Sequence, residues 1–155
     1  AKSITAALVL ALKEIEGCTI RAAVFPGPSA SEKVSLAVLD DEPAAKSLER
    51  LSAIGAYGST PIVEALQWAL SSFGASRARD KLLVIITDGR FPKELAHTAE
   101  EGFARRGIEL ALLSIEADNP GIARNWVRID DINEIQEAMV KLLSATRFRQ
   151  ALGQL

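Results

Sequence analysis

The chain has 155 residues, which is enough to bury a real hydrophobic core, and its length predicts one domain over residues 1–155. Its 18 basic and 20 acidic residues leave a net charge of −2. This balance gives no electrostatic case for binding to nucleic acid or anionic membranes, because both normally need a concentrated basic face. Cys18 is the only cysteine, so no intrachain disulfide can form, and no stretch approaches the ~20 apolar residues that span a bilayer.

The first half of the chain reads as a helix, a hairpin and a second helix. Apolar residues at helical spacing predict a helix over 2–16, which Gly17 ends. Residues 18–25 read as a strand, and turn residues separate it from a second strand over 33–40. In that strand Val34, Leu36 and Val38 alternate with Lys33, Ser35 and Ala37, which predicts an antiparallel pair with one apolar face. A helix over 43–53 follows Pro43.

The second half alternates helices with apolar strands. A helix is predicted over 61–73, with a buried stripe at Ile62, Leu66, Ala69 and Leu70. Residues 81–87 form a nearly continuous apolar run, typical of a central parallel strand covered on both faces. Further elements are predicted at 92–106 (helix), 108–115 and 126–129 (strands), and 131–146 (helix). This order predicts a three-layer, doubly wound, Rossmann-like α/β fold, with a mostly parallel sheet and one antiparallel hairpin at its edge.

Asp88 follows directly on the apolar strand over 81–87 and is itself followed by Gly89. Parallel α/β sheets place their ligands at the carboxyl ends of the strands. We therefore expect the Asp88 carboxylate to lie at the edge of the sheet where binding sites usually form.

Two stretches together resemble the von Willebrand factor A (vWA) domain family. "GSTPIVEAL" at 58–66 is similar to the family's loop-to-helix element, and "LLVIITDGRF" at 82–91 is similar to the strand that ends in its "TDG". The order and spacing of the predicted elements match over nearly the whole chain. The resemblance implies the vWA fold.

The resemblance also implies a metal-ion-dependent adhesion site, which in the family usually holds Mg²⁺. The matching ligand positions are Thr60 and Asp88, with Ser59 as an adjacent candidate. Hard oxygen ligands of this kind suit Mg²⁺ or Mn²⁺, and a glycine after Asp88 would let the backbone turn away from the ion. The third part of the family site, an Asp-x-Ser-x-Ser motif on the first central strand, does not occur in the sequence. We therefore expect that strand to be missing, the metal site to be incomplete, and apolar strand edges to be left open to self-association.

The same residues also have purely structural explanations. Asp88 can form a turn at the end of its strand, and Thr60 or Ser59 can cap the helix that Pro61 begins. His97, the only histidine, is expected to be exposed on a helix, Glu64 and Glu94 to be solvated, and Asp130 and Asp131 to start the last helix. Trp68 and Trp126 are expected to be core or rim anchors, and Cys18 to be a small buried thiol.

Three functions stay open at this point. The first is a non-catalytic, cytoplasmic, bacterial protein–protein interaction module of the vWA type. Intracellular relatives commonly work with AAA+ ATPases, as in magnesium and cobalt chelatases, and residues 84–94 and 132–143 resemble the CobT type of cobalamin biosynthesis. The second is a Mg²⁺-dependent α/β enzyme of phosphoryl transfer or hydrolysis that uses Asp88 and would need a second acidic group from Asp40, Asp41 or Asp118. The third is a scaffold that has lost its metal.

Overall fold

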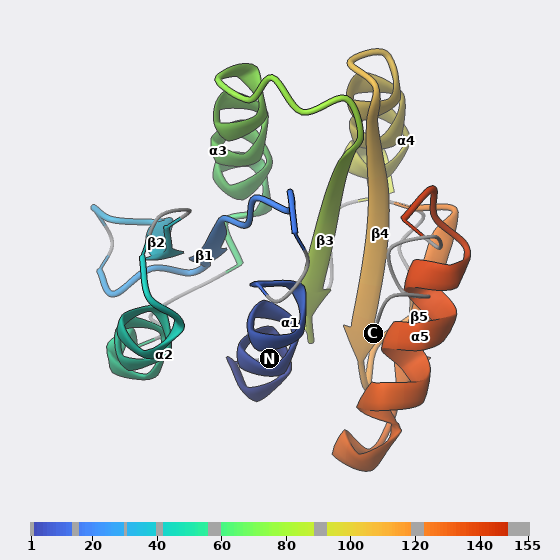
Figure 1. The fold of residues 1–155 in the computed structure, drawn as a ribbon. Helices are drawn as coiled ribbons and strands as arrows, with labels where there is room; N and C mark the ends of the chain where they lie inside the picture. The colour runs from blue at the N-terminus through green and yellow to red at the C-terminus, as the bar shows by residue number, and fades with distance from the viewer. Residues whose placement is uncertain are drawn as a thin grey trace. The chain divides into compact units, whose positions relative to one another are not determined.

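The computed structural model describes residues 2–13, 16–29, 31–39, 42–55, 60–88, 93–118 and 123–148, without the side chains of 93–97 and 132. Two compact units are formed, one from residues 2–72 and the other from residues 73–155, to which residue 1 is also assigned. Figure 1 shows the order of the elements along the chain. Each unit is described by itself.

The first unit packs helices against a short antiparallel hairpin. It contains α1 (Lys2–Lys13), β1 (Ala22–Val24), β2 (Ser35–Val38), α2 (Ala44–Ala53) and most of α3 (Ile62–Gly74). The strands β1 and β2 pair antiparallel, as predicted. Its core joins residues from α1, β2 and the end of α2, and it comprises Val9, Ala37, Val38, Leu51 and Ile54.

The predicted alternation along β2 is wrong at Ala37. The pairing passes from Ala22–Val38 to Ala23–Leu36, so β2 holds one more residue than β1 at that point. Such a bulge breaks the two-residue period of a strand. As a result Ala37 and Val38 are both buried, whereas Leu36 is exposed.

A glycine closes the loop between the two hairpin strands. The Gly27 N–H donates to the Lys33 carbonyl at 2.8 Å. A Cβ atom added at Gly27 would lie 1.9 Å from the Glu32 carbonyl oxygen. Because no side chain fits there, the loop can close this tightly only around glycine.

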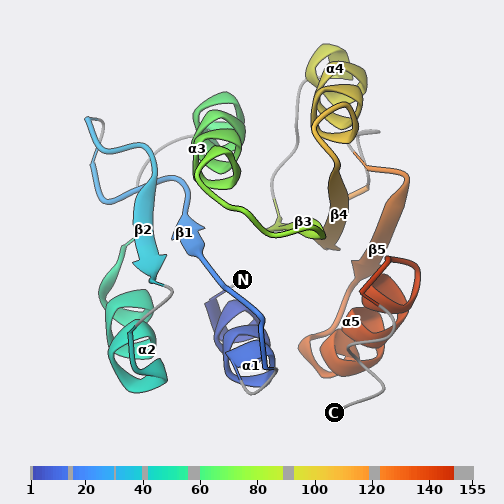
Figure 2. The ribbon, with the colours of Figure 1, turned by 45° about the horizontal axis from the view of Figure 1, so that its top comes forward.

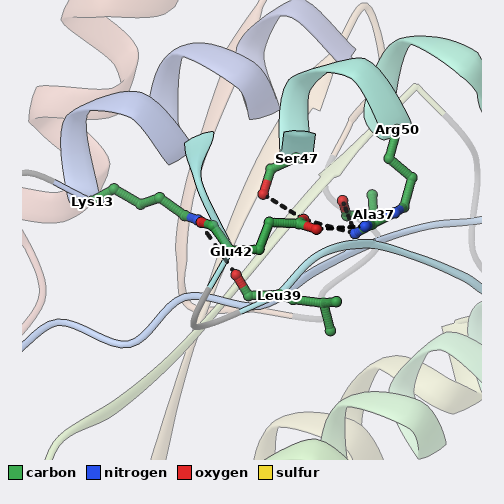
Figure 3. Close-up of polar contacts among 6 residues, drawn as sticks. All are labelled: Lys13, Ala37, Leu39, Glu42, Ser47 and Arg50. Atoms are coloured by element: carbon green, nitrogen blue, oxygen red, sulfur yellow. Dashed lines mark hydrogen bonds and ion pairs between the residues drawn. The ribbon is translucent and has the colours of Figure 1, made fainter. Parts of the chain in front are cut away.

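A half-buried carboxylate, that of Glu42, connects α2 to the strand before it (Figure 3). Glu42 accepts hydrogen bonds from Ser47 Oγ at 2.8 Å and from Arg50 Nη1 at 2.7 Å, and its side chain is 12 % exposed. Arg50 also donates to the Ala37 carbonyl at 3.3 Å, and Lys13 donates to the carbonyls of Leu39 and Glu42. The end of α1, the end of β2 and the start of α2 are thereby joined by charge-assisted hydrogen bonds.

The second unit is a parallel sheet with a helix on each face. Its strands are β3 (Lys81–Thr87), β4 (Ile108–Ile115) and β5 (Asn125–Ile129), in the order β3-β4-β5. The helices α4 (Lys93–Ala104) and α5 (Ile135–Ser144), the latter preceded by the 3₁₀ turn Ile132–Glu134, lie on opposite faces of it (Figure 2). This confirms the predicted α/β fold class, a mostly parallel sheet together with an antiparallel hairpin.

The central strand of this sheet is β4, not β3 as the apolar run over 81–87 predicted. Leu110, Leu112 and Leu113 on β4 are buried, whereas Leu82 and Val84 on β3 are only half-buried. Among the described residues β3 pairs with β4 alone, in register from Lys81–Ile108 to Thr87–Ser114. Within the described part of this sheet, β3 therefore has a neighbouring strand on one side only.

Candidate metal and interaction site

Asp88 lies where β3 ends, at the carboxyl edge of the β3-β4-β5 sheet. It is exposed, while Thr87 before it is buried. Because the three strands are parallel, the residues that follow β4 and β5 lie at this same edge, namely Glu116, Asp118, Asp130 and Asp131. The sequence therefore placed Asp88 correctly at the edge where α/β proteins bind ligands.

Arg128 neutralises part of the negative charge at this edge. Its guanidinium lies 2.7 Å from Asp118 Oδ1 and 2.8 Å from Asp130 Oδ1. The hydrogen bond to Asp130, followed by the one to Asp118, raises the pKa of Arg128. Asp118 was a candidate for a second acidic group of an enzyme, and it is engaged by this ion pair instead. The other two candidates, Asp40 and Asp41, lie outside the described residues.

At the start of the last helix, the carboxylates of Glu134 and Asp131 accept hydrogen bonds from backbone N–H groups. Glu134 Oε2 accepts the backbone N–H of Asp130 at 3.0 Å, and Asp131 Oδ1 accepts the N–H of Asn133 at 2.8 Å. These bonds satisfy N–H groups that a helix start leaves without an intrahelical partner. The prediction that Asp130 and Asp131 begin the last helix is confirmed in this sense.

The turn after β4 contains a strained residue that the sequence did not reveal. Glu116 has a φ of 54°, although it is not glycine, and its N–H donates to the Ile129 carbonyl at 2.9 Å. Ser114 Oγ donates to the carbonyl of Ala117 in the same turn. Glutamate gives no sequence signal for the left-handed region, which favours Gly, Asn and Asp.

Thr60 lies in the other unit, immediately before α3. It is half-buried, and its carbonyl accepts the N–H of Ile62 at 2.9 Å, while the Pro61 carbonyl accepts the N–H of Ala65 at 3.1 Å. The helix thus begins next to Thr60, as predicted. Ser59 lies outside the described residues. Ligation of one ion by Thr60 and Asp88 together stays a prediction.

Asp88 and Thr60 each offer a donor of the chemical type that a hard divalent cation prefers. The Asp88 carboxylate and the Thr60 hydroxyl are hard oxygen donors, whereas Mg²⁺ takes six ligands and fills the remainder with water or a partner's oxygen atoms. Within the described part of the chain, no group of three or more His, Cys, Asp or Glu side chains could hold a metal ion.

Other predicted residues have structural surroundings. Glu64 forms an ion pair with Lys33, and the hydrogen bond from Lys33 lowers the Glu64 pKa, so this carboxylate is not merely solvated as predicted. Cys18 is half-buried, and its burial raises the pKa of the thiol. Trp68 is half-buried and Trp126 is exposed. The side chains of His97 and Glu94 lie outside the described residues.

No helix in the described parts of the chain has the length and apolar character needed to cross a membrane.

Comparison with known proteins supports the fold. No protein-family model matches the sequence, and a search of curated proteins gave no match. The structure is similar to the conserved hypothetical protein BatB from Bacteroides thetaiotaomicron, with a TM-score of 0.67 and 20 % identity over 92 % of this chain and 84 % of that protein. It is also similar to proximal thread matrix protein 1 from the mussel byssus, with a TM-score of 0.65, 15 % identity and coverage of 92 % of this chain and 39 % of that protein. At these identities the likeness shows a shared α/β fold, which is consistent with the vWA-like fold that the sequence resemblance implies.

Proposed function

We propose that the chain is a non-catalytic protein–protein interaction module of the vWA type, whose binding edge is the carboxyl edge of the β3-β4-β5 sheet. The observation that carries the proposal is the placement of Asp88, an exposed carboxylate at the end of an apolar parallel strand. In this proposal Asp88 and Thr60 contribute to an incomplete divalent-cation site, and a carboxylate of the partner protein completes the coordination of Mg²⁺ or Mn²⁺.

The finer part of the proposal concerns the partner and the compartment. The resemblance of residues 84–94 and 132–143 to the CobT type of chelatase subunit supports an AAA+ ATPase as the partner, in the cytoplasm of a bacterium. The net charge of −2 and the single cysteine agree with such a setting.

An interaction module is preferred over a Mg²⁺-dependent enzyme because of Arg128. An enzyme of phosphoryl transfer or hydrolysis would need a second free acidic group beside Asp88. Asp118 is the described candidate for that role, and it forms a 2.7 Å ion pair with Arg128.

Calorimetric titration with MnCl₂ tests the metal part of the proposal. We expect weak binding by the wild-type chain and loss of binding in Asp88→Ala, because the carboxylate is the charged ligand of the site. Thr60→Val should weaken binding through loss of the hydroxyl. Asp118→Ala is the matched control, since it removes a carboxylate from the same edge and should leave binding in place. Equal binding by wild type and Asp88→Ala would overturn the proposed site.

A further inference from the structure

A cluster of arginines occupies the amino edge of the β3-β4-β5 sheet, opposite to the edge that carries Asp88. Residues that precede parallel strands share one edge of the sheet. Arg147 joins them because its N–H donates to Oε2 of Glu109, near the start of β4, at 3.1 Å. We call this cluster the arginine rim, and it consists of Arg77 and Arg79 before β3, Arg105 and Arg106 before β4, Arg124 before β5, and Arg147.

The side chains of the rim are exposed and only loosely paired. Arg79 is 95 % exposed and Arg124 is 89 % exposed, and their ion pairs with Asp80 and Glu100 measure 4.0 and 3.5 Å. By comparison, Arg128 at the other edge holds Asp118 at 2.7 Å. Long, exposed ion pairs contribute little to stability. The carboxylates of a partner can therefore take the place of Asp80 and Glu100 in these ion pairs with little loss of stability.

The backbone that presents the rim is held in place. The Ser76 N–H and the Lys81 ammonium group both donate to the Phe73 carbonyl, at 3.0 and 3.3 Å, which fixes the turn that contains Arg77 and Arg79. A fixed turn reduces the ordering cost of binding.

Part of the rim has a simpler structural role. Arg105 and Arg106 donate to the carbonyls of Glu101 and Gly102, at 3.3 and 2.9 Å, and so satisfy the C-terminal end of α4. This role does not account for Arg79 or Arg124, which lie outside the helices.

We propose that the arginine rim is a docking surface for an acidic segment of another protein. Guanidinium groups bind carboxylates in a bidentate geometry that lysine cannot offer, and the rim consists of arginines. Trp126, two residues after Arg124, is 39 % exposed and offers an apolar contact beside the charges. Arginine and tryptophan are the residue types enriched at energetically important interface positions.

The charge pattern favours a protein partner over nucleic acid. Acidic side chains are interspersed among the arginines, namely Asp80, Glu100, Glu101 and Glu109. A nucleic acid carries one charge per ~1.7 Å of duplex and cannot avoid these carboxylates. A protein segment can place neutral or basic residues opposite them.

Fluorescence anisotropy with three probes tests the proposal. The probes are a short peptide of alternating glutamate and serine, its lysine–serine counterpart and an oligo-dT of equal length, all at low salt with EDTA present. We expect the whole chain to bind the glutamate peptide in preference to the other two. Arg79→Glu/Arg124→Glu should weaken this binding about tenfold or more, since charge reversal places like charges in contact. The matched control is Lys46→Glu/Lys141→Glu, which changes net charge equally at exposed positions on α2 and α5 and should retain binding.

Several outcomes would overturn the proposal. They are equal loss in the control variant, preference for oligo-dT, and no binding of the glutamate peptide. If the chain bound no peptide but self-associated, and Arg79→Glu/Arg124→Glu abolished this self-association, the occupant of the rim would be a second copy of the chain and not an acidic segment of another protein. Because EDTA removes divalent cations and Asp88 lies at the other edge, this test is independent of the proposed metal site.

Discussion

At the scale of single residues, the charged groups of this protein fall into tightly and loosely held sets. Glu42 and Arg128 belong to the first set, because each makes charge-assisted hydrogen bonds to two side chains. Asp88 and the arginine rim are exposed. This division separates charges that build the fold from charges that are free to meet a partner.

The Glu42 cluster predicts a specific pH dependence of stability. The hydrogen bond from Arg50 is the main reason why the pKa of Glu42 is lowered in the folded chain. A carboxyl with a depressed folded pKa stabilises above its unfolded pKa, and this contribution is lost as pH falls through the folded value. Glu42→Gln should therefore lower the urea midpoint at about pH 7, and the difference from wild type should shrink below about pH 4.

Glu49→Gln on the exposed side of α2 is the control for this experiment, and its urea midpoint should stay near that of wild type at both pH values. A difference between wild type and Glu42→Gln that does not change with pH would contradict the assigned role of the carboxylate.

At the scale of helices and strands, the sequence predicted best where an element is long and apolar. The strand over 108–115 agrees with β4 at both ends, because six of its eight residues are apolar and most of them are buried, which leaves little ambiguity. The helix predicted over 92–106 ends earlier, at Ala104. The reason is a turn that closes on Gly107, whose φ is 70°.

Sequence patterns failed where tertiary contacts decide the outcome. The bulge at Ala37 and the pairing of Arg128 with Asp118 depend on which residues meet across strands and turns. The periodicity of a single segment does not contain this information. For the site, the position of Asp88 followed from the strand that precedes it, whereas the strain at Glu116 and the arginine rim required the topology of the sheet.

The helix α5 offers a direct test of the core of the second unit. Leu142 is fully buried, and α5 packs on β4 and β5. Leu142→Ala should lower the free energy of unfolding by about 2–5 kcal/mol, because it removes buried methyl groups and leaves a cavity. Val140→Ala, on the exposed side of the same helix, should change it by less than about 0.5 kcal/mol. Denaturant titration of both variants measures the contrast, and equal effects would place the core on the wrong face of α5.

At the scale of the whole molecule, we expect self-association through the edge of β3 that has no neighbouring strand among the described residues of its sheet. Natural edge strands are usually protected by charges, prolines or bulges. Residues 82–86 of β3 are all apolar and contain neither charge nor proline. The chain is therefore expected to pair with other chains along this edge.

Light scattering at increasing concentration tests the expected self-association. The apparent mass should rise for wild type and rise less for Val84→Lys, since a charge in the middle of an edge strand opposes pairing. Val140→Lys adds the same charge at an exposed position of α5 and should behave as wild type does. Comparable far-ultraviolet circular dichroism of the variants shows that they are folded. A wild-type chain that stays a monodisperse monomer would contradict the prediction.

The position of β3 at one side of its sheet also has a kinetic consequence. Successive amides of a parallel strand point alternately to its two sides, so that only every second N–H of β3 is directed at β4. Deuterium should enter β3 in an alternating pattern of fast and slow residues, while residues 111–114 of β4, which pair with strands on both sides, stay uniformly slow. If an added protein made the fast residues of β3 slow, the exchange pattern alone would locate the bound segment, residue by residue.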